Sequence, residues 1–147
     1  MTMPSDPLAL LRSRSYVALL VMLWHPHSGS LSMANAGALP PMICRNGEIL
    51  KIRVEGVPLG LLESRDYEEI IFQTQPGDIV VLHSDGVPDQ LNRRGDEYSR
   101  RRLGKVVQAS CALPVQSIVE AIFKDVDKFG AGAEAFDDQT LLVMKVT

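Results

Sequence analysis

The sequence has few of the features that define several large classes of protein. Cys44 and Cys111 are the only cysteines among its 147 residues, and they form no CxxC motif. Two isolated thiols are typical of a reducing cytoplasm, and they argue against a disulfide scaffold and a zinc site. His25 and His27 form one HxH pair in a Pro-containing turn. This pair indicates a solvated turn, with metal binding as the less favoured alternative.

The chain also lacks an excess of positive charge and a long apolar run. Its formal net charge is −3 and its pI is about 5.6, so neither nucleic acid nor a membrane surface is an expected partner. One local basic cluster, interpreted as a solvated helix face, contains Arg93, Arg94, Arg100, Arg101, Arg102 and Lys105. The apolar run 16–24 is too short for a bilayer span, which needs about 20 residues. Arginines before it and MANAGA after it imitate a secretory signal, which stays open as an alternative at this point.

What the sequence does contain is a series of strand patterns, ordinary for one globular domain with 46% hydrophobic residues. Residues 16–24 and 30–36 flank a turn and predict a hairpin; residues 41–45 and 48–54 flank Asn46-Gly47 and predict a second. The tight turn QPGD joins 68–74 to 79–83, which are predicted to be adjacent strands. A final strand is predicted over 139–147, and the almost continuously apolar character of 79–83 and 141–146 predicts burial on both faces.

Two segments have helical periodicity. Residues 99–110 carry apolar residues at helical spacing, and residues 114–129 begin with proline and place five apolar side chains on one face. The predicted order is therefore strands, then helices, then a strand. This order favours an α+β domain in which antiparallel sheet is covered by helices.

Carboxylates stand at the ends of two predicted strands. Asp85 follows residues 79–83, and Asp137 and Asp138 precede the final strand. If the two strands are antiparallel neighbours, these carboxylates converge, and a proton or a cation must relieve their repulsion. Oxygen ligands alone favour a hard cation, Mg²⁺ or Mn²⁺. The alternative is that these aspartates are ordinary turn and cap residues.

Four segments in order, HSDGVPDQLN, EYSRRRLGKVV, SIVEAIFKDV and FDDQTLLVMKV, resemble the carboxyl-terminal part of the PPM-type, protein phosphatase 2C-like serine/threonine phosphatases. The branch they resemble is that of sporulation stage II protein E. The earlier runs ANAGALPP and VEGVPLGLL agree with it in type and order. The likeness makes residues 1–14 an N-terminal lead and residues 15–147 the carboxyl-terminal part of such a domain. It also makes ANAG an internal loop and sets the secretory signal aside.

The resemblance implies a fold, a cofactor and a substrate class. The fold is an antiparallel β-sandwich covered by helices, in four αββα layers, here incomplete. Asp85 and Asp137 match metal-ligating aspartates, with no catalytic residues apart from such ligands; Asp138, Gly86, Asn35 and Gly37 match supporting positions. The cofactor is Mn²⁺ or Mg²⁺, binuclear in the intact family, where metal-activated water attacks phosphorus. The expected substrate is a cytoplasmic phosphoprotein, such as an anti-sigma-factor antagonist.

The sequence departs from the family pattern in its first 34 residues. A strand ending in Gly-Asp and a following S-G-H-G-like run are absent there, and Asp6 has neither the strand nor the glycines. Without that bridging aspartate we expect weak or single-site metal binding, and an inactive chain when it stands alone. Half of a sandwich should also expose apolar surface, which predicts a homodimer. The alternative function is therefore a non-catalytic, dimerising interaction module of the same fold.

Overall fold

A computed structural model describes residues 15–135 and 137–147 of the protein, so the predicted N-terminal lead lies outside the described residues. The chain divides into two compact units. Among the described residues, unit 1 comprises those up to Ala38 together with Val54–Phe72, and unit 2 comprises those of Leu39–Arg53 and Gln73–Thr147.

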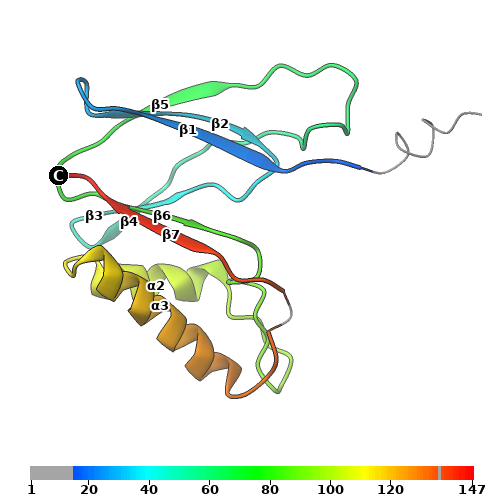
Figure 1. Ribbon diagram of the computed structural model, residues 1–147, viewed down its shortest axis with the longest axis vertical. Helices are drawn as coiled ribbons and strands as arrows, with labels where there is room; N and C mark the ends of the chain where they lie inside the picture. Colours follow the sequence, from blue (N-terminus) through cyan, green and yellow to red (C-terminus); the bar gives the residue numbers. More distant parts are fainter. Residues whose placement is uncertain (1–14, 136) are drawn as a thin grey trace, which may run out of the picture. The chain divides into compact units, whose positions relative to one another are not determined.

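Unit 1 is built on a three-stranded sheet in the order β1-β2-β5 (Figure 1). Strands β1 (Leu19–His25) and β2 (Ser30–Ala36) pair antiparallel in one hairpin, and β5 spans Glu69–Gln73. The first predicted hairpin is therefore confirmed. Along β1 the apolar side chains of Leu19, Val21 and Leu23 are 44–57% exposed, so the described residues leave one face of this strand uncovered.

Unit 2 contains a four-stranded antiparallel sheet in the order β4-β3-β6-β7. Its strands are β3 (Met42–Arg45), β4 (Glu48–Leu50), β6 (Ile79–His83) and β7 (Leu141–Lys145). Asn46 and Gly47 turn the β3–β4 hairpin with φ angles of 50° and 79°, the left-handed conformation that this dipeptide tolerates. The second hairpin is thus confirmed, although β4 is shorter than the predicted run 48–54.

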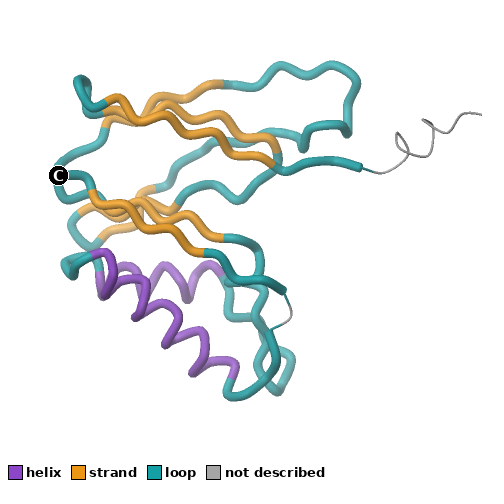
Figure 2. The backbone as a smooth tube through the Cα atoms, viewed as in Figure 1, coloured by secondary structure: helices purple, strands orange, loops and turns teal. Residues whose placement is uncertain are grey.

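Helices α2 (Arg100–Ser110) and α3 (Val115–Gly130) cover one face of this sheet (Figures 1 and 2). The Ser99 hydroxyl caps α2 by accepting from the Arg102 amide at 3.4 Å. The apolar faces of both helices meet the sheet in one core, whose largest members include Tyr98, Ile79, Leu103, Ile118 and Ile122. The α+β class, with antiparallel sheet covered by helices, is confirmed. Within the described ranges, neither helix has the length and apolar character needed to cross a membrane.

Two expectations about neighbouring strands are wrong. Strands β5 and β6 are not adjacent, because β3 and β7 occupy both edges of β6 and the QPGD turn leads from one sheet into the other. Strand β7 is not buried on both faces, because Leu142 and Met144 on one of its faces are exposed.

One buried ion pair holds the turn before β6. Asp78, 1% exposed, accepts hydrogen bonds from Arg45 Nε at 2.9 Å and Arg45 Nη2 at 2.7 Å. It also accepts one from the Gln75 amide at 2.8 Å. Burial alone would raise the pKa of Asp78, but these hydrogen bonds outweigh it and hold the pKa below its ordinary value.

We predict that Asp78→Asn lowers the free energy of unfolding at pH 7 by about 2–4 kcal/mol, because it leaves the Arg45 charge without its carboxylate. Because the pKa of the Asp78 carboxyl is lower in the folded than in the unfolded protein, its carboxylate stabilises the fold at pH values above the unfolded-state pKa of about 4. This stabilisation is lost as pH falls from about 4 through the lower folded-state pKa. Urea unfolding at a series of pH values should therefore show that the free energy of unfolding falls more steeply below about pH 4 for the parent than for Asp78→Asn. Asp96→Asn, which alters an exposed pair with Arg94, is the control and should change stability by less than about 1 kcal/mol. If the free energy of unfolding fell equally with decreasing pH in the parent and in Asp78→Asn, the stabilising role of the Asp78 carboxylate would be contradicted.

Candidate metal-binding site at the β6–β7 junction

The candidate site lies where β6 ends and β7 begins. The two strands pair antiparallel from Ile79 opposite Lys145 to His83 opposite Leu141. Beyond them, the Ser84 amide donates to the Thr140 carbonyl at 3.0 Å, and the Thr140 amide donates to Ser84 Oγ at 2.9 Å. The Ser84 hydroxyl itself donates to the Asp138 carbonyl at 3.0 Å. The pairing on which the convergence of the aspartates depended is confirmed.

Gly86 allows these two segments to approach more closely than another residue would. A Cβ atom at Gly86 would overlap the Asp138 carbonyl oxygen, lie 2.9 Å from its carbon and 3.2 Å from the Asp137 oxygen. The chain after β6 therefore contacts the backbone of Asp137 and Asp138 directly. This contact gives Gly86 a steric role that its turn propensity does not indicate.

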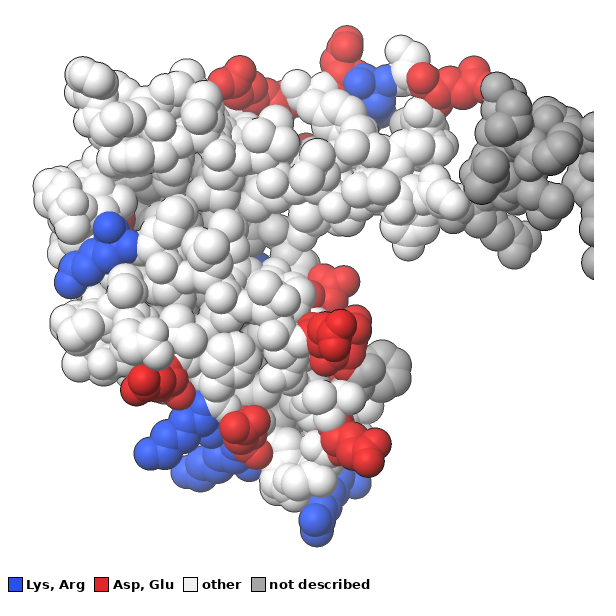
Figure 3. Space-filling view, viewed as in Figure 1, with Lys and Arg blue, Asp and Glu red and all other residues white. Residues whose placement is uncertain are grey.

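Three acidic residues lie at or next to this backbone contact, and all three are exposed: Asp85, Asp137 and Asp138. Figure 3 shows acidic side chains gathered in the region where β6 ends and β7 begins. Asp137 Oδ1 accepts from the Asp138 amide at 2.7 Å, which fixes the orientation of that carboxylate. The Asp85 carbonyl accepts from the Asp89 amide at 3.0 Å and closes a helical turn.

The oxygen ligands available here are of the type that a hard cation prefers, but they are too few to fill its coordination shell. Carboxylate oxygens are the ligands that Mg²⁺ and Mn²⁺ prefer, and exposure leaves room for bound water. The part of the chain that the structure describes holds no group of three or more His, Cys, Asp or Glu side chains close enough to share an ion. Two carboxylates therefore leave most positions of an octahedral ion to water or to further protein groups.

Hydrogen bonds of Arg100 and His83, which the sequence did not reveal, form a clamp on the chain next to Asp85. Arg100 Nη1 donates to His83 Nε2 at 2.9 Å, and Arg100 Nη2 donates to the Pro40 carbonyl at 2.8 Å. His83 Nδ1 then acts as a donor to the Ser84 carbonyl at 3.1 Å. Burial lowers the pKa of both His83 and Arg100, so a neutral imidazole is favoured. The clamp thereby fixes the backbone of Ser84, the residue before Asp85. In the sequence, Arg100 is only one member of a basic run, and nothing there distinguishes it from its neighbours.

A second clamp joins the loops on either side of the junction. The buried Gln90 accepts at Oε1 from Gln139 Nε2 at 2.9 Å. Gln90 Nε2 in turn donates to the Glu134 carbonyl at 3.3 Å. The Tyr98 amide donates to the Gln90 carbonyl at 2.8 Å. Gln90 thereby links the loop after Asp85 to the loop before Asp137 and to the start of α2.

Asn35 and Gly37 belong to unit 1, where both have structural roles. Asn35 is buried, and its Nδ2 donates to the carbonyls of Ala38 and Val54 at 2.9 Å each. Gly37 has a φ of 75°, and a Cβ atom there would lie 2.6 Å from Pro58 Cδ. The structure therefore explains both residues by the loop they hold, and their support of a metal site stays a prediction.

The other sequence candidates have structural explanations. His25 Nε2 lies 3.0 Å from Ser32 Oγ, within the first hairpin. Cys44 and Cys111 are free thiols. Burial, together with a hydrogen bond to Cys111, raises the pKa of Cys44 to about 11, so it stays a protonated, unreactive thiol at neutral pH.

Comparison with known proteins identifies the family and the fold. The family model for Stage II sporulation protein E (SpoIIE) matches residues 5–147. Stage II sporulation protein E of Bacillus subtilis is 23% identical over 120 residues, covering 80% of this chain and 14% of that protein. Phosphoserine phosphatase RsbU of B. subtilis is 28% identical over 94 residues, covering 64% of this chain and 28% of that protein.

A solved structure shares the fold. The phosphatase domain of the cell fate determinant SpoIIE from B. subtilis, presoaked with Mn, superposes with a TM-score of 0.65 at 17% identity. The match covers 97% of this chain and 60% of that one. The chain therefore belongs to the SpoIIE family and has the fold of part of a PPM-type phosphatase domain. It spans only a small share of the curated relatives it matches.

We predict that Gly86→Ala destabilises unit 2 by about 1–3 kcal/mol, because the added methyl group forces the junction apart. Gly104→Ala is the matched control, since its Cβ would meet side chains at 3.8 Å in a helix interior. That control should be neutral or stabilising by up to about 1 kcal/mol. Thermal and urea unfolding of both variants checks this, and equal stability of the two would count against the close approach.

Proposed function

We propose that residues 15–147 form the carboxyl-terminal part of a metal-dependent protein serine/threonine phosphatase domain. The observation that supports this most directly is the β6–β7 junction, which holds Asp85 and Asp137 on neighbouring backbone segments. The substrate we propose is a phosphorylated regulatory protein in cytoplasmic signalling, of the anti-sigma-factor antagonist type. Membership of the SpoIIE family and likeness to RsbU support this class.

In this proposal Asp85 and Asp137 would hold Mn²⁺ or Mg²⁺. A bound ion supplies a water of lowered pKa and offsets charge on the phosphoryl oxygens. The Asp138 amide orients the Asp137 carboxylate, and the His83–Arg100 clamp fixes the backbone that carries Asp85. Gly86 keeps the two segments in contact. The protein thus contributes placement of negative oxygens and no covalent chemistry of its own.

Two carboxylates make an incomplete inner shell, so we propose that this chain alone binds one ion weakly and hydrolyses phosphoesters negligibly. Clustered carboxylates repel one another in the absence of a cation. Removing the charge of Asp85 therefore relieves repulsion in the metal-free protein while it removes a ligand from the metal-bound one. Stability and metal affinity should respond in opposite directions.

Calorimetric titration with Mn²⁺ tests this prediction. Asp85→Asn should weaken Mn²⁺ binding at least tenfold and leave stability unchanged or slightly higher, whereas Asp127→Asn on α3 should bind within about twofold of the parent. In a longer phosphatase that carries this segment, Asp85→Asn should lower Mn²⁺-dependent phosphoprotein hydrolysis by about 100-fold or more. Equal Mn²⁺ affinity of the parent and Asp85→Asn, or equal losses of stability and activity, would make Asp85 a structural residue.

The second candidate is a non-catalytic module that dimerises. The specific observation in its favour is the exposed apolar side chains of unit 1, among them Ile71 at 72% exposed and Leu23 at 57%. Sedimentation equilibrium of the 147-residue chain distinguishes the two ideas together with the titration above. A dimer without Mn²⁺ binding favours the module, and Mn²⁺ binding that depends on Asp85 favours the phosphatase part.

A further inference from the structure

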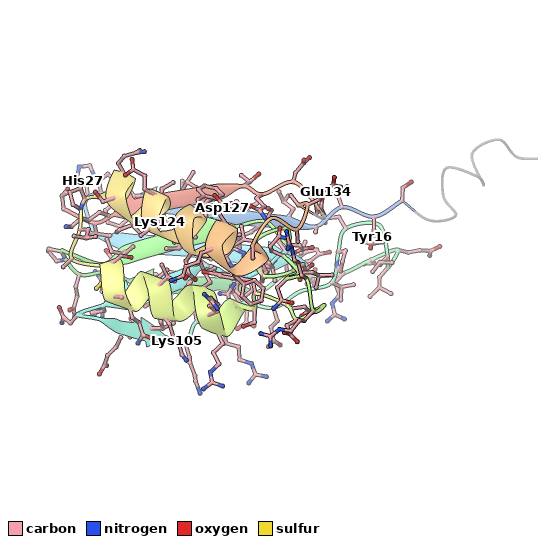
Figure 4. The ribbon with its side chains drawn as sticks, turned by 90° about the horizontal axis from the view of Figure 1, so that it is seen from below. Tyr16, His27, Lys105, Lys124, Asp127 and Glu134 are labelled. Atoms are coloured by element: carbon pink, nitrogen blue, oxygen red, sulfur yellow. The ribbon has the colours of Figure 1, made fainter. Side chains whose placement is uncertain are left out.

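A groove runs between α2 and α3 on the side that faces away from the sheet. It lies wholly within unit 2 and has a volume of about 840 Å³. Figure 4 looks onto this outer side, with the two helices side by side, Lys105 on α2 and Lys124 on α3. The lining positions recur one helical turn apart on each helix, at 101, 105 and 109 on α2 and at 121, 125 and 129 on α3. The groove therefore follows the seam between the helices.

The floor of the groove is ordered and its charges are matched. Arg102 donates to both oxygens of Asp125, at 2.9 and 3.0 Å, and its guanidinium lies 4.8 Å from the Phe129 ring centroid. The Tyr98 hydroxyl donates to Asp125 at 2.7 Å, and the Tyr98 and Phe129 rings pack edge to face. Since these groups satisfy one another, the floor presents a fixed surface with little net charge.

The rims, in contrast, carry positive charge. Arg101 and Lys105 on α2 and Lys124 and Lys128 on α3 are all exposed. None of the four forms an ion pair with any residue in the described ranges. Apart from the paired Asp125, Glu97 is the carboxylate that lines the groove, at the end where α2 begins. Within a chain of net charge −3, positive charge is thus concentrated along both sides of one groove.

Small and apolar side chains line the space between the rims. The small side chains of Ala109 and Ala121 leave a hollow there, and Val106 and Phe129 are only partly buried. An occupant must therefore bring apolar side chains to this hollow and carboxylates to both rims. Nucleic acid has no apolar side chains for such a hollow, and a flat lipid surface does not enter a groove. The rim cations are spaced one turn apart along each helix, about 6 Å, which matches carboxylates at i and i+4 of a helix.

We propose that the α2–α3 groove binds an acidic amphipathic helix of a partner protein. The 11 residues of α2 extend about 16 Å, so the groove accommodates roughly three turns of such a helix. Its apolar stripe contacts Val106, Ala109 and Ala121, and its acidic flanks face the rim cations, in the helix-in-groove mode of recognition. This surface is separate from the carboxylates of the β6–β7 junction and does not depend on the proposed function.

The probe is a synthetic 14-residue helical peptide with leucines at i, i+3, i+4 and i+7 flanked by glutamates, titrated by fluorescence anisotropy against the 147-residue chain. Lys105→Glu/Lys124→Glu should weaken its binding at least tenfold. Lys51→Glu/Lys145→Glu changes two exposed lysines outside the groove and alters net charge equally, and it should bind within about twofold of the parent. Binding to the parent should also weaken as salt increases, because the rim charges are exposed.

Two further comparisons keep the test decisive. Ala109→Gln fills the hollow without altering charge, uses a good helix former at an exposed position, and should weaken binding at least fivefold. A peptide with leucines replaced by serines should bind at least tenfold more weakly, as should an oligothymidylate of equal charge. The proposal is overturned if the parent does not bind the leucine peptide, if both lysine pairs have equal effects, or if the serine peptide or the oligonucleotide binds as tightly.

Discussion

The antiparallel pairing of β6 with β7 is the interaction on which the rest of unit 2 depends. It brings together residues more than fifty positions apart, and the hydrogen bonds of Ser84 with Asp138 and Thr140 extend it beyond the last strand residues. Gly86 then allows the backbones to touch. Because the pairing fixes where Asp85 and Asp137 leave the sheet, any chemistry that they perform follows from strand register.

The helical layer serves the same junction. The loop after Asp85 is tied to the start of α2 by hydrogen bonds from the Tyr98 and Ser99 amides to the Gln90 and Pro88 carbonyls. Arg100 then reaches back from the first turn of α2 to His83. A helix that buries Leu103 and Val107 against the sheet therefore also holds the carboxylate loop in place. The same helix carries cations on its outer side, so unit 2 keeps an acidic junction and a basic groove on different surfaces.

Much of this fold could be predicted from local patterns. Asn46-Gly47 specifies its hairpin because few other dipeptides adopt its backbone angles, and α3 follows from five apolar residues at helical spacing. The adjacency of β5 and β6 could not be judged this way, since a tight turn indicates a change of direction but not which sheet receives the next strand. The burial of β7 was misjudged because an apolar sequence does not reveal whether both faces of the strand are covered.

The site was predictable in part for a similar physical reason. Carboxylates at strand ends are visible in the sequence, and their convergence needed only the correct pairing of β6 and β7. The His83–Arg100 clamp and the Arg102–Asp125 floor were not visible, because the run RRR gives no sign of which arginine turns inward. Three consecutive positions on a helix point in different directions, so one basic run separates into a clamp, a groove rim and a paired floor.

The most direct test of the account is paramagnetic relaxation by Mn²⁺ in the amide spectrum of the ¹⁵N-labelled chain. We expect substoichiometric Mn²⁺ to broaden the signals of residues 84–86 and 137–140 together, and Asp85→Asn to remove both effects. Broadening confined to one of the two segments, or unchanged by Asp85→Asn, would contradict the claim that the β6–β7 junction assembles a single cation site.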